Sequence, residues 1–220
     1  MRARQLVWDL PVRLVHWLIA ALVAFSWWSV HHHHTDWHIW SGCAILTLLI
    51  FRLLWGFFGS STARWSSLIH KPRALADHLK GRWVGVGHNP LGGLSVIAMF
   101  LALAIQVALG LISEDEDGIY TGPLSGLVSI EASDNARDIH ELWFKIILAL
   151  IFLHLAAIAY YRFRGRKIIK PMITGRAEVD PGTEPIHLGK WWVALICLAI
   201  GIGVTRWIIA GAPPFSHWSP

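Results

Sequence analysis

Residues 138–162 read DIHELWFKIILALIFLHLAAIAYYR, a mostly apolar run that is long enough to span a membrane. Its two histidines, His140 and His154, are 14 residues apart. On an α-helix this spacing is almost four turns, so both side chains leave the same face, about 21 Å apart along the axis. Because a histidine inside an apolar span costs free energy, it marks a functional site by default. The two histidines therefore predict two separate sites, each completed by a ligand from another helix.

The composition indicates an integral membrane protein. The chain has 220 residues, of which 55% are hydrophobic and 14 are tryptophans, and its mean hydropathy is +0.49. Many tryptophans stand where apolar runs end, as interfacial aromatic belts require. The net charge of +5 would also fit a nucleic-acid-binding protein. However, the basic residues lie beside apolar runs, which favours membrane topology and no nucleic-acid partner.

Five apolar runs predict five transmembrane helices in a single membrane domain that covers residues 1–220. The expected spans are approximately residues 12–30, 37–58, 91–113, 139–161 and 191–211. Lys and Arg gather at the N-terminus and in the loops before the third and fifth spans, whereas Glu114–Asp117 form an acidic run after the third span. Because cytoplasmic loops are enriched in Lys and Arg, the N-terminus is expected to be cytoplasmic and the C-terminus outside. A loop of about 25 residues is expected outside, between the third and fourth spans.

This topology predicts the depth in the membrane of each histidine in the spans. His16 and His154 are expected near the cytoplasmic side, and His38 and His140 near the outer side. Two such pairs are what two bis-histidine haems stacked in a four-helix bundle require, because each iron takes one imidazole from each of two facing helices. The alternative for any one histidine is an interfacial, hydrogen-bonded side chain. The predicted fold is an all-α membrane protein, with a four-helix bundle holding two haems and a fifth C-terminal helix.

Two arginines fit the same sites. Arg52 is 14 residues after His38, so it shares that helix face and lies at the depth of the cytoplasmic pair. A buried guanidinium needs an anion, and a haem propionate is a suitable one. Arg13, three residues before His16, could serve in the same way or extend to the lipid headgroups. Gly42, one turn after His38, could give a flat macrocycle close access or serve ordinary helix packing.

Other residues of the sequence carry weaker signals. The run His31–His34 could capture a metal ion or form a docking patch that responds to protonation, but a solvated turn is the simpler interpretation. His88 could line a quinone or proton site, or could cap and anchor the third span. The two cysteines, Cys43 and Cys197, are expected to be free thiols. There is no CxxCH motif, so any haem is held without covalent attachment.

Several short motifs together resemble the bacterial cytochrome b561 family, which includes the b-type cytochrome subunits of nickel–iron hydrogenases. The motifs are VWDLPVRLVHW (7–17), WHIWSG (37–42), FRLLWGFFGS (51–60), GHNP (87–90), TGPL (121–124), HE (140–141) and PMITGR (171–176). The resemblance implies a transmembrane cytochrome with two non-covalent b-type haems. It also implies ligands at His16, His38, His140 and His154, in agreement with the pairing by depth.

The function expected from this resemblance is electron transfer between the quinone pool of a respiratory chain and a partner redox protein, in the bacterial inner membrane. An exchangeable quinone and a periplasmic cytochrome c or another redox subunit are the expected partners. The fifth span goes beyond the shorter family members that act alone, which favours electron transfer for a partner over a self-contained enzyme. The alternative is a stand-alone oxidoreductase that oxidises a small reductant such as superoxide and reduces quinone. A non-haem metalloenzyme and a transporter fit less well, because the histidines lie at two depths and no broken helix or repeat is visible.

Overall fold

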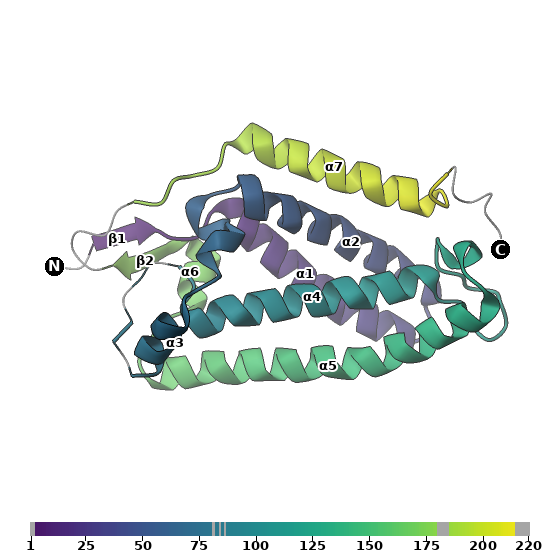
Figure 1. Ribbon diagram of the computed structural model, residues 1–220, viewed down its shortest axis with the longest axis horizontal. Coiled ribbons are helices and arrows are strands. Elements are labelled where there is room, and N and C mark those ends of the chain that lie inside the picture. The colour runs from purple at the N-terminus through teal and green to yellow at the C-terminus, as the bar shows by residue number, and fades with distance from the viewer. Residues whose placement is uncertain (1–2, 81, 84, 86, 180–184, 214–220) are drawn as a thin grey trace. The chain divides into compact units, whose positions relative to one another are not determined.

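The computed structural model describes residues 3–80, 82–83, 85, 87–179 and 185–213. Five of its helices are long and apolar enough to cross a membrane, which makes this an all-α membrane fold (Figure 1). They are α1 (Leu10–His31), α2 (Thr35–Phe58), α4 (Pro90–Ile112), α5 (Ile130–Phe163) and α7 (Trp191–Ile209). The shorter elements are β1 (Ala3–Leu6), η1 (Ser61–Ala63), η2 (Trp65–Ser67), α3 (Pro72–Leu79), η3 (Ser125–Leu127), α6 (Ile169–Thr174) and β2 (Arg176–Val179).

The five long helices confirm the five spans predicted from hydropathy, and most of their ends agree within two residues. The exception is α5, which begins at Ile130 and not near residue 139. Ser129 accounts for this early start: its Oγ accepts a hydrogen bond from the Ala132 backbone N–H, as a helix N-cap residue does. The outer loop expected between the third and fourth spans is therefore shorter, because its last nine residues, 130–138, are helical.

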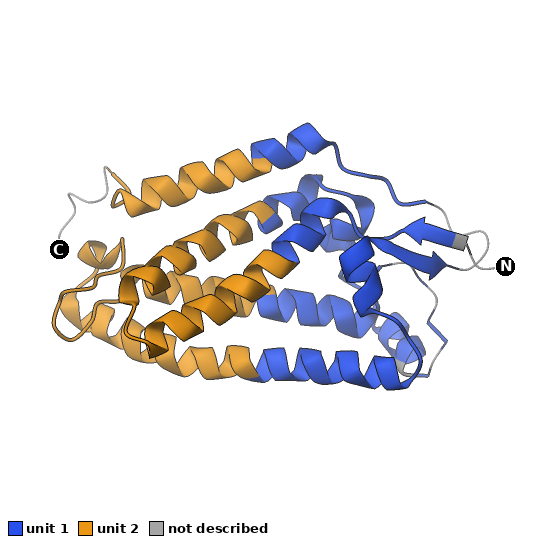
Figure 2. Cartoon of the chain, turned by 180° about the vertical axis from the view of Figure 1, so that it is seen from behind, with its two compact units in different colours: residues 1–16, 52–99, 149–196 blue, residues 17–51, 100–148, 197–220 orange. Residues whose placement is uncertain are grey.

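The chain forms two compact units (Figure 2). Unit 1 comprises residues 1–16, 52–99 and 149–196, and unit 2 comprises residues 17–51, 100–148 and 197–220. Each of the five long helices contributes one segment to each unit. The predicted grouping of all 220 residues as one membrane domain stays a prediction.

In unit 1, a small antiparallel sheet joins the N-terminus to the segment before α7. Strand β1 pairs with β2 in the register Ala3↔Val179 to Leu6↔Arg176. Gly175 precedes β2 with a φ of 78°, which a residue without Cβ adopts readily. Its carbonyl accepts hydrogen bonds from the N–H groups of Val7 and Trp8. The sheet thus fixes the entry to α1, the helix that carries His16.

In unit 2, α1 and α2 form a helical hairpin, and α7 packs on α2. The buried residues of α7 are Cys197, Gly201 and Thr205, which recur every fourth position and so share one face. Thr47 of α2 donates a hydrogen bond from its Oγ1 to Thr205 Oγ1 at 2.9 Å. A small residue at position 201 lets the helices approach closely, as in other membrane helix pairs.

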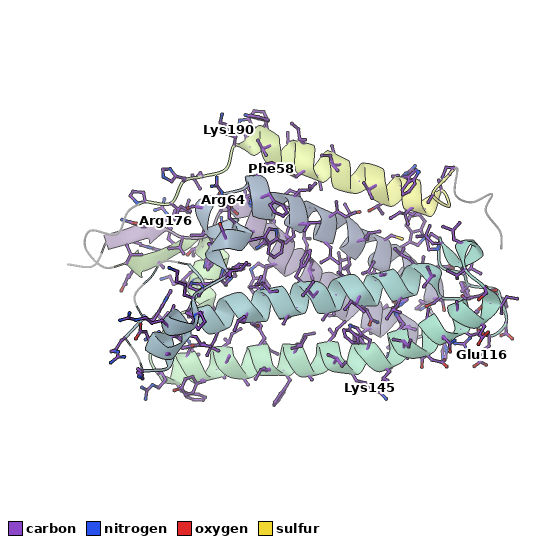
Figure 3. All side chains as sticks on the ribbon, viewed as in Figure 1. Phe58, Arg64, Glu116, Lys145, Arg176 and Lys190 are labelled. Carbon is purple, nitrogen blue, oxygen red and sulfur yellow. The ribbon has the colours of Figure 1, made fainter. Side chains whose placement is uncertain are left out.

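Charged side chains differ between the two units. Of the charged residues labelled in Figure 3, Arg64, Arg176 and Lys190 belong to unit 1, and Glu116 and Lys145 belong to unit 2, with Glu116 in the α4–α5 loop. Glu116 and Asp117 are exposed in that loop. The orientation of the chain in the membrane stays a prediction.

Candidate functional site

His16 of α1 and His154 of α5 face each other in unit 1. Their ring centroids are 6.4 Å apart, and their planes are inclined by 53°. The two residues are 138 positions apart in the sequence, so only the packing of α1 against α5 can bring them together. The structure therefore unites the two histidines that their expected depth had paired.

Arg52 of α2 lies in the same unit and is 8% exposed. Its Cζ stands 4.6 Å from the centroid of the Trp65 ring, a cation–π contact that shields one face of the guanidinium. Its Nη1 is buried and has no hydrogen-bond partner among the described residues. Leaving one donor of a buried charged group without a hydrogen-bond partner costs about 1–3 kcal/mol or more. The site therefore fits an anion that would complete it.

His88 is a second incompletely paired polar residue of unit 1. Its ring centroid is 4.4 Å from that of Trp8, and its Nδ1 is buried without a hydrogen-bond partner in the described part of the chain. Burial, followed by the positive charge of Arg52, lowers the pKa of His88 to about 3. His88 is thus neutral at pH 7 and available as a hydrogen-bonding group, while Arg52 supplies the positive charge.

Asp9 is a structural residue of unit 1 whose contacts were not predicted from the sequence. Its Oδ1 accepts a hydrogen bond from the Val12 N–H at 2.8 Å, and its Oδ2 accepts one from the Trp55 Nε1–H at 2.9 Å. It therefore caps α1 and ties it to α2, the helix that carries Arg52. The sequence does contain a signal for the cap, because Asp9 is followed by Leu10 and Pro11.

Arg13 uses its guanidinium to bind backbone carbonyls. Its Nε donates to the carbonyl of Asp9 at 3.3 Å, and its Nη1 donates to the carbonyl of Ile173. These bonds connect α1 to α6, a use that the sequence did not predict. The role of Arg13 beside a haem stays a prediction.

His38 of α2 and His140 of α5 form the second pair, in unit 2. Their ring centroids are 5.9 Å apart, and their planes are nearly perpendicular, at 82°. His38 Nδ1 lies 3.1 Å from the carbonyl oxygen of Ser26 and 2.9 Å from its Oγ. His140 Nδ1 lies 2.9 Å from the carbonyl oxygen of Gln106. Since a carbonyl only accepts, each Nδ1 carries the proton, and each Nε2 presents a lone pair that can ligate a metal.

Two glycines leave room beside these rings. A Cβ at Gly110 would stand 3.0 Å from Cε1 of His140, so a larger residue there would displace the ring. A Cβ at Gly42 would meet no atom within 4 Å, and open space therefore lies over this turn of α2. Such a gap, one turn from His38, is where a flat macrocycle would need access to the helix.

Both separations fit an iron held between two imidazoles. Metal–imidazole bonds are about 2 Å long, and each nitrogen is about 1.1 Å from its ring centroid, so two axial ligands have centroids roughly 6 Å apart. The observed values are 6.4 and 5.9 Å. Two ligands for each metal are enough only if a macrocycle supplies the others. Among the described residues, no group of three or more His, Cys, Asp or Glu side chains could hold a metal ion.

The run His31–His34 joins α1 to α2 as an exposed turn. The Nδ1 atoms of His31 and His32 bond to the carbonyls of Trp27 and Trp28. The rings lie on aromatic neighbours, for example His34 and Trp37 with centroids 4.5 Å apart. This arrangement agrees with the simpler interpretation, a solvated turn.

The sequence profile of the family described as prokaryotic cytochrome b561 matches residues 7–175, well over half of the chain. The chain belongs to the prokaryotic cytochrome b561 family. No curated protein and no solved structure matches the chain significantly. The match ends before α7 begins at Trp191, so the fifth helix lies outside the matched residues.

Membership of the cytochrome b561 family confirms the resemblance drawn from the motifs. It establishes a multi-pass membrane protein that binds b-type haem and transfers electrons. All four histidines of the two pairs fall inside the matched residues. Their roles as ligands, the number of haems and the relation to hydrogenase subunits stay predictions.

Proposed function

We propose that the chain is a dihaem b-type cytochrome of the bacterial inner membrane that carries electrons between the quinone pool and a partner redox protein. One observation carries the proposal: each compact unit holds one facing histidine pair with the separation that a six-coordinate haem iron needs. When bound, haem supplies one-electron chemistry, since its iron alternates between the ferric and ferrous states.

In unit 1, His16 and His154 would be the axial ligands of one haem. Arg52 and His88 would complete the site, because both bury a polar atom without a partner among the described residues. Arg52 would bind a propionate as a charge-assisted donor. Neutral His88 would supply a further hydrogen bond. The contacts of Asp9 with α1 and Trp55 would hold the helices that carry these side chains in register.

In unit 2, His38 and His140 would be the axial ligands of the other haem. The carbonyls of Ser26 and Gln106 would orient the imidazoles and make them stronger ligands. Because each haem would be held by two histidines of the chain, oxygen or a small substrate would have to displace a protein ligand to bind. This favours electron transfer over a self-contained oxidase reaction.

The charge pattern supports an orientation with the N-terminus and the basic loops before α4 and α7 on the cytoplasmic side, and the acidic α4–α5 loop on the periplasmic side. The N-terminus would then be cytoplasmic and the C-terminus periplasmic. A periplasmic cytochrome c or another redox subunit would exchange electrons beside unit 2. The acidic run Glu114–Asp117 disfavours the alternative of superoxide oxidation, because it repels an anionic reductant.

The test is to reconstitute the protein in vesicles that contain a quinol and an outer soluble cytochrome c. The proposal expects quinol to reduce haem b, giving a reduced-minus-oxidised b-type spectrum, and the outer cytochrome c to reoxidise it. A haem that quinol leaves oxidised would contradict the quinone assignment. Reduction by superoxide at a rate exceeding that by quinol would favour the stand-alone oxidoreductase instead.

A further inference from the structure

The end of α5 and the residues after it form an open pocket of about 490 Å³ in unit 1. Three cationic and three uncharged residues line it: Arg162, Arg166, Lys167, Ala159, Phe163 and Gly165. Phe163 is 89% exposed, so the pocket combines a cluster of positive charge with an accessible apolar wall.

Gly165 gives the pocket its shape. With a φ of 77°, it ends α5 in a Schellman motif: the Gly165 N–H donates to the Arg162 carbonyl, and the Arg166 N–H donates to the Tyr161 carbonyl, both at 2.9 Å. The last carbonyls of the helix are thus capped by backbone groups. The side chains of Arg166 and Lys167 are therefore not needed to cap the helix, and both residues line the same pocket as Arg162.

The three cations have no ion pair or side-chain hydrogen bond to any other residue that the structure describes. Arg166 packs on the Tyr161 ring, with its Cζ 5.8 Å from the ring centroid. Tyr161 in turn has its hydroxyl 2.8 Å from Nε2 of His78. Burial, and then the charge of Arg166, lower the pKa of His78 from its usual value. Like charges in one pocket repel, so an anion bound there would relieve a real electrostatic cost.

The position of the pocket restricts the kind of anion. Helix α5 is apolar and of membrane-spanning length, so its end lies at a membrane surface whichever way the chain is oriented. Basic pockets at such positions suit anionic lipid headgroups, and guanidinium groups match phosphate geometry through paired N–H donors. We propose that this pocket binds the phosphate of an anionic phospholipid, with Ala159 and Phe163 against the start of an acyl chain.

The experiment measures binding of fluorescent phosphatidylglycerol and phosphatidylcholine to the haem-loaded protein in detergent micelles. The pocket variant is Arg162→Gln/Arg166→Gln/Lys167→Gln. Its matched control, Lys71→Gln/Arg73→Gln/Lys80→Gln, removes the same charge at and around α3, where all three side chains are exposed. A single Arg166→Gln variant serves if the triple variant folds poorly, and an unchanged haem spectrum verifies the fold of each.

The expected result is that phosphatidylglycerol binding weakens about ten- to a hundredfold in the pocket variant and stays close to wild type in the control. Phosphatidylcholine should bind weakly to all proteins, and millimolar inorganic phosphate should not displace phosphatidylglycerol. Equal phosphatidylglycerol binding by the wild type and the pocket variant would overturn the proposal. Equal affinity for the two lipids would also overturn it. Complete displacement by inorganic phosphate would show a site for a soluble anion instead.

Discussion

At the residue scale, the candidate sites are defined by polar atoms that the surrounding protein either satisfies or leaves incomplete. In unit 2, backbone carbonyls accept hydrogen bonds from the Nδ1–H groups of His38 and His140. The Nε2 atom of each ring therefore keeps its lone pair for a metal. In unit 1, Arg52 and His88 keep buried nitrogens without partners among the described residues. The first arrangement suits the proposed ligation by Nε2, and the second suits the proposed binding of an anion.

Replacing Arg52 by leucine should affect only one of the two haems. A buried positive charge stabilises the reduced iron and holds the propionates, so its removal should lower that haem's potential by roughly 50–100 mV, for an effective dielectric of about 20. It could also loosen that haem. A redox titration followed by absorption spectroscopy measures both potentials.

The Arg52→Lys variant is the matched control, because it keeps the charge and should restore most of the potential. If Arg52→Leu left both potentials unchanged, Arg52 would be only a packing partner of Trp65.

At the residue scale, much of the candidate site could be predicted from the sequence. Histidines are costly in an apolar span, which singled out these four residues. The 14-residue spacing of His140 and His154 puts both on one helix face, and the predicted topology then paired each with a histidine of the same depth. The carbonyl partners of His38 and His140 could not be predicted, because they depend on how α1 and α4 pack against those rings. The hydrogen bond between Asp9 and Trp55 could not be predicted either, because it depends on how the start of α1 packs against α2.

At the element scale, α7 packs on α2 through the single face that contains Cys197, Gly201 and Thr205. A Cβ at Gly201 would stand 2.9 Å from the backbone oxygen of Thr47, so this contact tolerates only glycine. Gly203 is exposed, and a Cβ there would meet no atom within 4 Å. The two glycines therefore form a matched pair for testing the packing of α7.

Gly201→Leu should destabilise the protein by about 1–3 kcal/mol, because leucine would force α7 away from α2. Gly203→Leu should leave stability unchanged or slightly raised, since the helical propensity gained is the same at both positions. Thermal unfolding of the haem-loaded protein measures the difference. Both variants should keep the wild-type haem spectrum, because α7 contributes no histidine. Equal stability of the two variants would show that the face of α7 that contains Gly201 does not pack on α2.

Element boundaries and local pairings were less predictable than the spans. Hydropathy identified all five long helices, but the start of α5 at Ile130 depends on a cap at Ser129 and precedes the apolar run. The pairing of β1 with β2 joins segments from opposite ends of the chain. A four-residue strand has too weak a periodicity to reveal such a partner.

At the scale of the whole molecule, each of the two units holds one histidine pair, and their loops differ in charge. In the α4–α5 loop, Asp115 is used structurally, since its Oδ1 accepts a hydrogen bond from the Tyr120 N–H at 3.0 Å. Glu116 and Asp117 are exposed, so their carboxylates are accessible to a partner protein. A soluble cytochrome commonly presents a basic patch around its haem edge, so complementary charge here would speed encounter.

Neutralising Glu116 and Asp117 together should slow electron exchange with a basic cytochrome c severalfold at low salt, without altering either haem's spectrum. The effect should fade as ionic strength rises, because salt screens exposed charges. Stopped-flow kinetics at several salt concentrations measures it. Glu178→Gln, which removes a carboxylate from unit 1, is the control. An unchanged rate at low salt would leave the acidic run with a structural role only.

The central claim, one bis-histidine haem in each unit, is tested most directly by counting haems per polypeptide in double variants. The wild type should bind two. His16→Ala/His154→Ala and His38→Ala/His140→Ala should each bind one, because each removes both ligands of a single site. His16→Ala/His38→Ala should bind none, because it breaks both sites. One haem in the wild type, or one retained when both pairs are broken, would contradict the account.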